Sequence, residues 1–266
     1  MTFEVAPELE DLFAAQAPFK TAVSLEGKVY RELEQRKTLA FEHNQLRYFI
    51  KLHFGTTWPE IVKNLLQLKR PVLGASNEWF ALHHLPRHQV NTASPLAYFD
   101  NLAFPTRRKS FVVMSAVNDF IDLEHLAKQG RWRAMGLRER KLLLKSVAML
   151  ARNMHACGIQ HRDFYLCHIL LPQSWLAGKK EHPPELTLID LHRAVHKNRL
   201  SRRRLVKDMS ALFYSTMADA GLTNKERAYF VRQYSSKSIK ANLALWRDVA
   251  NKAASLRRKA DRKQLQ

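Results

Sequence analysis

The chain has 266 residues, of which 46% are hydrophobic, so it is long enough for one large domain or two fused lobes with a sizeable core. No stretch approaches the roughly 18 continuous apolar residues of a membrane-spanning helix, and the acidic N-terminal stretch lacks the features of a secretory signal. The 44 Lys and Arg residues against 24 Asp and Glu residues give a net charge of +20, which indicates a polyanionic partner: nucleic acid, an anionic membrane surface or an anionic substrate.

Three regions are expected along the chain. Residues 1–24 are expected to form an irregular or weakly helical lead-in, residues 25–117 a strand-rich N-terminal lobe, and residues 118–266 a mainly helical C-terminal lobe that ends in a basic helix. This order of elements predicts an α+β fold.

The sequence of the N-terminal lobe predicts a β-hairpin and an amphipathic helix. Two runs of β-favouring residues, 38–43 and 46–52, flank Asn44-Gln45, which predicts a β-hairpin. Apolar residues at helical spacing predict an amphipathic helix over residues 58–68, ended by Pro71. Further strands are expected at 96–102 and 110–117.

The C-terminal lobe has the clearest helix signals. Apolar residues at helical spacing predict a long helix over residues 137–156, and Gly158 follows it as a terminating residue. Asp122 can cap a short helix that extends to Gln129, and Thr223 and Glu226 have the spacing of a capping box. Short strands are expected at 169–171 and 186–189, and the chain after residue 200 is expected to be helical.

A polar loop lies between the long helix and the first of these short strands. It contains His161-Arg162-Asp163, and His168 follows Asp163 by five positions. This is the spacing of a protein-kinase catalytic loop, in which the Asp orients the attacking hydroxyl group and takes up its proton. Asp163 is therefore the candidate catalytic base. His168 occupies the position of a metal-binding Asn in most kinases, and it could bind the metal ion, orient Asp163 or contact phosphate.

A kinase also needs a Lys that binds the nucleotide phosphates and an acid that holds this Lys. Lys51 lies within an apolar strand run, and Glu78 near the start of a later predicted helix is its candidate partner. The simpler interpretation of Lys51 alone is a side chain that reaches solvent from a strand end.

Asp190 directly follows the short apolar strand, and its position downstream of the loop is that of the metal-binding Asp of a kinase. An ordinary turn Asp is the alternative for this residue alone. The order of Lys51, Glu78, Asp163 and Asp190 along the chain favours a protein-kinase-like fold of two lobes. Asp208, His161 and Arg162 are expected to support the loop. The two cysteines, Cys157 and Cys167, are expected to be reduced thiols.

One kinase feature is missing from residues 29–41, where a glycine-rich phosphate loop is expected. This stretch contains no glycine, so backbone amides are less able to approach phosphates there. Arg31, Arg36 and Lys37 are candidates for side-chain contacts to phosphate, and a solvated charged turn is the alternative.

The sequence resembles one specific family, the lipopolysaccharide core heptose(I) kinases (the WaaP/RfaP group) of Gram-negative bacteria. The resemblance runs from about residue 25 to 235, and the tail after about residue 240 has no match in it. The matching stretches are residues 29–34 with 36–38, 48–53, 60–68, 71–75, 77–79, 161–168 and 188–193. The glycine-free loop and the His at 168 are features of this group.

The resemblance implies transfer of the γ-phosphate of ATP to the first heptose of the lipopolysaccharide inner core. It implies ATP and Mg²⁺ as cofactors, Asp163 as base, Lys51 and Glu78 as the phosphate-positioning pair, and Asp190 with His168 at the metal. It also implies a cytoplasmic enzyme, peripheral at the inner face of the inner membrane.

The charge distribution suggests where the acceptor binds. Residues 193–207 contain seven Lys or Arg and no acid, which suits an acceptor with sugar carboxylates and lipid phosphates, or else a solvated basic loop. The candidate substrate-binding residues are Arg193, Arg202, Arg203 and Arg204. From charge alone we hypothesise that an acidic protein such as an acyl carrier protein also docks.

Three alternatives stay open at this point. One is a kinase for another inner-core sugar such as Kdo. The second is a pseudokinase scaffold, suggested by the missing glycines and by His168. The third is a basic nucleic-acid-binding protein, although no recognisable nucleic-acid motif is present and no nucleic acid is expected.

Overall fold

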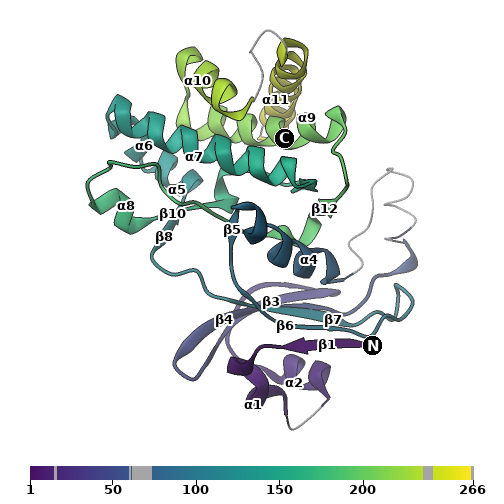
Figure 1. The fold of residues 1–266 in the computed structure, drawn as a ribbon. Coiled ribbons are helices and arrows are strands. Elements are labelled where there is room, and N and C mark those ends of the chain that lie inside the picture. The colour runs from purple at the N-terminus through teal and green to yellow at the C-terminus, as the bar shows by residue number, and fades with distance from the viewer. Residues whose placement is uncertain (15–16, 60, 62–73, 236–241, 265–266) are drawn as a thin grey trace. The chain divides into compact units, whose positions relative to one another are not determined.

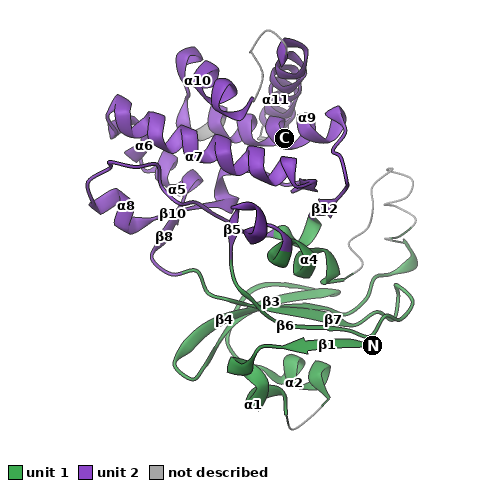
Figure 2. Ribbon diagram, in the orientation of Figure 1, with its two compact units in different colours: residues 1–83, 93–117, 191–193 green, residues 84–92, 118–190, 194–266 purple. Residues whose placement is uncertain are grey.

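The computed structural model describes residues 1–14, 17–59, 61, 74–235 and 242–264 (Figure 1). The chain divides into two compact units, coloured separately in Figure 2. Unit 1 comprises Met1–His83, Ala93–Val117 and Leu191–Arg193, and unit 2 comprises His84–Thr92, Asn118–Asp190 and Ala194–Gln266. The helix predicted over residues 58–68 lies largely outside the described residues.

Unit 1 is built on a six-stranded antiparallel sheet with the strand order β1-β6-β7-β4-β3-β2. Its strands are β1 (Thr2–Val5), β2 (Lys28–Leu33), β3 (Arg36–His43), β4 (Leu46–His53), β6 (Pro95–Asp100) and β7 (Ser110–Ser115). The predicted hairpin is confirmed: Asn44 and Gln45 have φ angles of 48° and 62°, the left-handed pair that a two-residue turn between twisted strands requires.

Strand β4 has two chemically different faces. Successive side chains of a strand point to opposite faces, and Tyr48, Ile50 and Leu52 are buried in the core on one of them. Lys51 therefore projects from the opposite face, although it is surrounded in sequence by apolar residues. This alternation explains how a charged side chain is accommodated in an apolar run.

The N-terminal segment is more structured than the sequence pattern indicates. The expectation of an irregular or weakly helical lead-in is wrong for β1, which pairs antiparallel with β6 and forms an edge of the sheet. A 3₁₀ turn (Pro7–Leu9) and helices α1 (Glu10–Phe13) and α2 (Pro18–Ser24) follow. Leu9 and Phe13 join the hydrophobic core of unit 1. A four-residue strand is too short for its alternation to be recognised, and its partner lies far away in the sequence.

Unit 2 is mainly helical, with a four-stranded sheet of order β5-β11-β10-β8 and a two-stranded pair of β12 and β9. Its helices are α5 (Leu123–Lys128), α6 (Arg131–Ala134), α7 (Leu137–Ala156), α8 (Gln173–Ala177), α9 (Arg202–Ser215), α10 (Asn224–Tyr234) and α11 (Leu243–Gln264). Its strands are β5 (Asn91–Thr92), β8 (Phe120–Asp122), β9 (Ile159–Gln160), β10 (Ile169–Pro172), β11 (Thr187–Leu188) and β12 (Val195–His196). Helix α4 (Ser76–His84) lies almost entirely in unit 1.

The helix caps of unit 2 follow the predicted signals. The Asp122 side chain accepts a hydrogen bond from the backbone N–H of His125 at 2.9 Å and so begins α5. Thr223 and Glu226 form the predicted capping box of α10. The basic helix α11 packs on α9 and buries Val249 and Ala253 completely. Within the described chain, no helix is long and apolar enough to cross a membrane.

The packing of Leu9 generates a test of the N-terminal segment. Leu9→Ala is expected to lower the free energy of unfolding by about 2–5 kcal/mol, because it leaves a cavity where a fully buried side chain was. Val23→Ala is the matched control, since Val23 is 46% exposed, and its effect should stay within about 0.5 kcal/mol. Urea unfolding measures both. Equal midpoints for Leu9→Ala and the native chain would contradict a structural role of this segment.

Candidate active site

Lys51 of β4 and Glu78 of α4 form the ion pair that the sequence predicts. The Nζ atom of Lys51 lies 2.7 Å from Oε1 of Glu78 and donates a hydrogen bond to it. The Glu78 side chain is 1% exposed and the Lys51 side chain 13% exposed. Because removing either partner leaves a buried charge, we expect the pair to hold both side chains in fixed positions.

The surroundings of Lys51 limit the amount of positive charge. His53 is buried two residues further along β4, and this burial, with Arg36 as the next cause, lowers its pKa to about 3. His53 is therefore neutral at physiological pH.

The catalytic loop begins where α7 ends. Gly158 has a φ angle of +81°, and a Cβ atom there would lie 2.0 Å from the carbonyl oxygen of Lys197. Only glycine permits both this backbone conformation and this close approach. The turn delivers β9 to its antiparallel partner β12, and the His161-Arg162-Asp163 tripeptide follows β9 directly.

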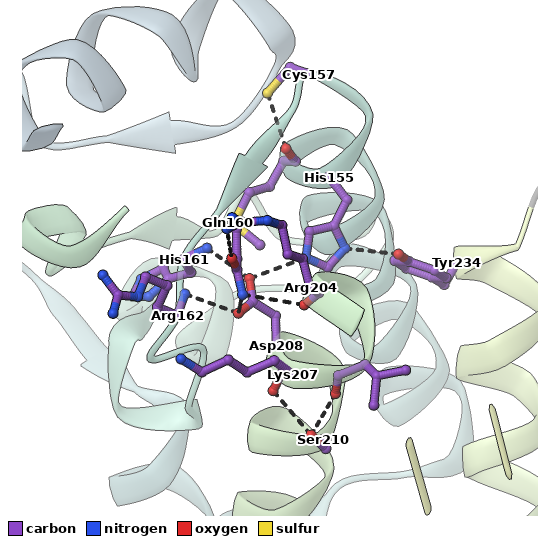
Figure 3. A network of polar contacts seen from close by, with 12 residues as sticks. His155, Cys157, Gln160, His161, Arg162, Arg204, Lys207, Asp208, Ser210 and Tyr234 are labelled. Atoms are coloured by element: carbon purple, nitrogen blue, oxygen red, sulfur yellow. Dashed lines mark hydrogen bonds and ion pairs between the residues drawn. The ribbon is translucent and has the colours of Figure 1, made fainter. Parts of the chain in front are cut away.

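The carboxylate of Asp208, on α9, organises this tripeptide (Figure 3). It accepts hydrogen bonds from the backbone N–H of His161 at 2.7 Å and from that of Arg162 at 3.0 Å. Asp208 is completely buried, so these bonds are made in a medium of low polarity, where they are strong. The supporting role predicted for Asp208 agrees with this geometry.

A chain of side chains extends from Asp208 to α10. The hydroxyl group of Tyr234 lies 2.8 Å from Nδ1 of His155, and Nε2 of His155 lies 3.4 Å from the Asp208 carboxylate. Burial raises the pKa of Tyr234, so its hydroxyl group stays protonated within this chain of contacts.

Two residues of the site have strained backbones. Arg162 has a φ angle of 75° and Asp190 one of 61°. This left-handed region costs roughly 1 kcal/mol or more for a side-chain-bearing residue and persists only where the surroundings impose it. For Arg162 the surroundings are supplied by Asp208.

Asp163, His168 and Asp190 are brought together in unit 2. Nδ1 of His168 donates a hydrogen bond to the backbone carbonyl of Asp163 at 2.7 Å, and Nε2 of His168 lies 3.5 Å from the Asp190 carboxylate. Of the three roles considered for His168, orientation of Asp163 is supported by a direct contact, the hydrogen bond to the Asp163 carbonyl oxygen.

Backbone contacts hold Asp190 in this group. The backbone N–H of Ile189 donates to the carbonyl oxygen of His168 at 3.0 Å. Nε2 of His161 donates to the carbonyl oxygen of Ile189 at 3.0 Å. Burial lowers the pKa of His161, which keeps its imidazole neutral in this role. His161 thus ties the start of the loop to the residue before Asp190.

The four candidate substrate arginines are divided between the two units. Arg193 lies in unit 1, and the other three lie at the start of α9 in unit 2. Arg204 donates to Oε1 of Gln160 at 2.6 Å, and Arg202 pairs with Asp248 of α11 at 2.7 Å. Arg203 is exposed. Arg202 and Arg204 thus make structural contacts, and substrate binding by the four remains a prediction.

Cys157 and Cys167 are free thiols, as the sequence predicts. Burial raises the pKa of Cys167 to about 12, so it stays protonated.

The sequence did not predict the contribution of His155 and Tyr234 to the support of the loop. A His in the last turn of the helix before a catalytic loop is a weak signal, and nothing local in the sequence marks Tyr234.

Asp208→Asn tests the support of the loop. The amide group offers one acceptor where the carboxylate serves two backbone N–H groups, so unfolding free energy should fall by about 1–3 kcal/mol. Asp248→Asn is the control, because its carboxylate is 48% exposed and its pair with Arg202 is worth about 1 kcal/mol or less. Equal stability of the two variants in urea would contradict the role of Asp208.

Comparison with known proteins places the chain. The profile of the lipopolysaccharide kinase (Kdo/WaaP) family matches residues 20–234. The lipopolysaccharide core heptose(I) kinase WaaP of Escherichia coli is 38% identical over 266 residues, covering 98% of this chain and 99% of its own length. The enzyme of the same name from Pseudomonas aeruginosa is 38% identical over 251 residues, covering 94% and 91%.

A solved structure, "WaaP in complex with acyl carrier protein", has a TM-score of 0.79 and 32% identity, covering 98% of this chain and 99% of that one. The full-length alignments include most of α11, which the sequence resemblance left unmatched. The predicted kinase-like fold and phosphotransferase class are confirmed. The chain belongs to the lipopolysaccharide kinase (Kdo/WaaP) family.

Proposed function

We propose that this kinase transfers the γ-phosphate of ATP to a hydroxyl group of the first heptose of the lipopolysaccharide inner core. The observation that carries the proposal is the grouping of Asp163, His168 and Asp190 on a loop braced by Asp208. The acceptor is supported by relatives named heptose(I) kinases that align over nearly the whole chain.

Asp163 acts as the base in this proposal. Its carboxylate orients the acceptor hydroxyl group, whose oxygen attacks the γ-phosphorus while the bond to the bridging oxygen of ADP breaks. The hydroxyl proton passes to Asp163. The hydrogen bond from His168 to the backbone carbonyl of Asp163 fixes the position of this residue.

Lys51, held by Glu78, binds the phosphate oxygens of the nucleotide. A positive charge there stabilises the charge that develops on the leaving ADP. Because no glycine lies between β2 and β3, side chains rather than backbone amides are expected to contact the phosphates there. Lys37 is one candidate, and its ammonium group is restrained by Glu32 at 3.4 Å.

Asp190 and His168 fit a Mg²⁺ ion that is shared with the nucleotide. Nδ1 of His168 donates to the carbonyl oxygen of Asp163, and its Nε2 lies 3.5 Å from the Asp190 carboxylate, so the two side chains face each other. The described residues contain no group of three or more His, Cys, Asp or Glu side chains able to hold a metal. Two protein ligands at most suit Mg²⁺, which takes its remaining ligands from phosphates and water, and Asp190 is the preferred ligand because Mg²⁺ favours oxygen. When bound, this ion neutralises phosphate charge.

Kdo is the second candidate acceptor, because the family description names it beside WaaP. Inner-core acceptors that contain Kdo with and without the first heptose separate the two. Incorporation of phosphate only in the presence of heptose supports the first proposal, and equal incorporation in both supports Kdo.

Asp163→Asn is expected to lower the turnover number by about 10²–10⁴-fold, because it removes the proton acceptor while preserving the shape of the side chain. Transfer of labelled γ-phosphate to dephosphorylated inner-core lipopolysaccharide measures the effect. Asp261→Asn is the control, since Asp261 is exposed and pairs with Arg257 within α11. Equal activity of Asp163→Asn and the native chain would contradict the assignment of Asp163 as the base. ATP binding without transfer by the native chain would favour a pseudokinase scaffold.

We also propose that an acyl carrier protein binds this chain. Two observations support the partner: the net charge of +20, which suits an acidic protein, and the solved complex of WaaP with acyl carrier protein. Co-purification of the two proteins at low salt, with binding that weakens as salt rises, is the expected result. Absence of binding at low salt would contradict this partner.

The site of action that follows is the inner face of the inner membrane, with the enzyme peripheral to it. The net charge and the lipid-linked acceptor support this location. Binding of the full chain to vesicles of anionic lipid tests this location.

A further inference from the structure

An apolar tip projects from the sheet of unit 1. It consists of Leu102 and Phe104, in the loop between β6 and β7, and of Trp58. Their exposed fractions are 59%, 57% and 58%. The rings of Trp58 and Phe104 lie 5.4 Å apart, and the backbone N–H of Thr56 donates to the carbonyl oxygen of Pro105 at 3.1 Å. The two chain segments therefore form one apolar surface.

A buried charge network anchors the base of this loop. The carboxylate of Asp100 is fully buried and accepts hydrogen bonds from Nε of Arg108 at 3.0 Å, from the hydroxyl group of Tyr98 at 3.1 Å, and from the backbone N–H of Leu102 at 2.9 Å. The Arg108 side chain lowers the pKa of Asp100 despite its burial, so the carboxylate stays charged. The first turn of the loop is thereby fixed.

Asn101 closes the loop from within. Its Oδ1 atom accepts from the backbone N–H groups of Ala103 at 3.2 Å and Lys109 at 3.0 Å, and its Nδ2 donates to the carbonyl oxygen of Arg107 at 3.2 Å. The loop is thus preorganised by side-chain contacts. Its apolar side chains are exposed in a defined backbone structure.

The exposure of Leu102 is imposed by the backbone. Leu102 has a φ angle of 53°, a conformation that costs roughly 1 kcal/mol for a residue with a side chain. Asn or Gly would adopt it more readily. The hydrogen bond from its backbone N–H to Asp100 holds this conformation, while the Leu102 side chain is 59% exposed and therefore offsets little of the strain by packing. Backbone strain of this kind clusters at functional sites.

The charge around the tip is basic. Residues 101–109 contain Arg107, Arg108 and Lys109 and no acid. Asp100 neutralises Arg108, whereas Arg107 and Lys109 are exposed. Lys109 lies over the ring of Phe19 at 5.7 Å, which restrains its ammonium group. Aliphatic and aromatic side chains next to exposed cations are the combination that binds an anionic lipid surface.

We propose that the Leu102–Phe104–Trp58 tip inserts into the interfacial layer of an anionic bilayer, with Arg107 and Lys109 on its lipid phosphates. The proposal rests on the proposed function in one respect, since a lipid-linked acceptor places the enzyme at a bilayer. The tip has the shape for this partner: apolar side chains project from a rigid loop, and Trp occupies the depth that it prefers at membrane interfaces.

Vesicle binding by the full chain tests the proposal. Vesicles of phosphatidylethanolamine with phosphatidylglycerol should bind the native chain, and vesicles of phosphatidylcholine alone should bind it weakly. The double variant Leu102→Asn with Phe104→Ser should bind the anionic vesicles about tenfold more weakly. Asn retains the left-handed backbone, so the loop keeps its fold. Leu46→Ser is the matched control, because Leu46 is 57% exposed at another turn of the same sheet, and its affinity should be unchanged.

The basic residues have a separate test. Arg107→Gln with Lys109→Gln should weaken binding by about tenfold at low salt and reduce its dependence on salt. Arg152→Gln, which removes an exposed cation from α7, should leave both unchanged. Trp58 supplies a direct signal, because it alone among the five tryptophans, all of them described, is exposed. Its emission should shift to shorter wavelength with vesicles, and the shift should be lost in Trp58→Phe.

Two results would overturn the proposal: equal affinity of the loop variant and the native chain for anionic vesicles, or no binding by the native chain. A loop variant that loses acyl carrier protein but keeps vesicle binding would make the tip a protein-docking site instead. Phosphate transfer to a delipidated core oligosaccharide should be equal in the loop variant and the native chain. Vesicle binding by the Asp163→Asn variant should be intact, so failure of the kinase assignment and failure of the membrane surface are seen separately.

Discussion

The catalytic half of this enzyme depends on one buried carboxylate. Asp208 accepts the backbone N–H groups of His161 and Arg162, and these two bonds hold the chain in a conformation that it would not adopt alone. The position of this loop also affects Asp190. The ring of His161 donates a hydrogen bond to the carbonyl oxygen of Ile189, the residue directly before Asp190. The Asp208 carboxylate thus helps to position the proposed base, Asp163, and the proposed metal ligand, Asp190. His155, which is hydrogen-bonded to Tyr234, and the side-chain amide of Gln160 also contact this anion, at 3.4 Å and 3.5 Å.

The phosphate-binding half relies on strand alternation. Because β4 directs Tyr48, Ile50 and Leu52 into the core, its opposite face is available for a charged residue, and Glu78 of α4 meets Lys51 there. Burial at the same end of the strand keeps His53 neutral. The result is a lysine held in a defined position beside buried apolar neighbours, which suits the proposed phosphate-binding role.

Much of this structure could be predicted from the sequence, for identifiable reasons. The hairpin at Asn44, the caps at Asp122 and Thr223 and the long α7 depend on contacts between residues close in the chain, and each leaves a local signal. Lys51, Glu78, Asp163 and Asp190 were found by their order and spacing. The supporting contacts were harder to predict, because Tyr234 and Arg204 act on residues that lie far away in the sequence. Strand β1 was missed for the same reason, and the exposure of Leu102 depends on a turn whose hydrogen bonds no periodicity reveals.

The position of β1 has a consequence for synthesis of the chain. Thr2 pairs with Asp100 and Val5 with Ala97, so β1 finds its partner only after about ninety further residues have been added. At bacterial elongation rates of about 5–20 residues per second, this interval lasts several seconds. During that time β2, β3 and β4 can form their local hairpins, whereas β1 and the apolar side chains of Leu9 and Phe13 stay without the strands that later cover them. Closure of this sheet edge is therefore a late, long-range step, and until it occurs the apolar side chains of this segment are open to contact with chaperones.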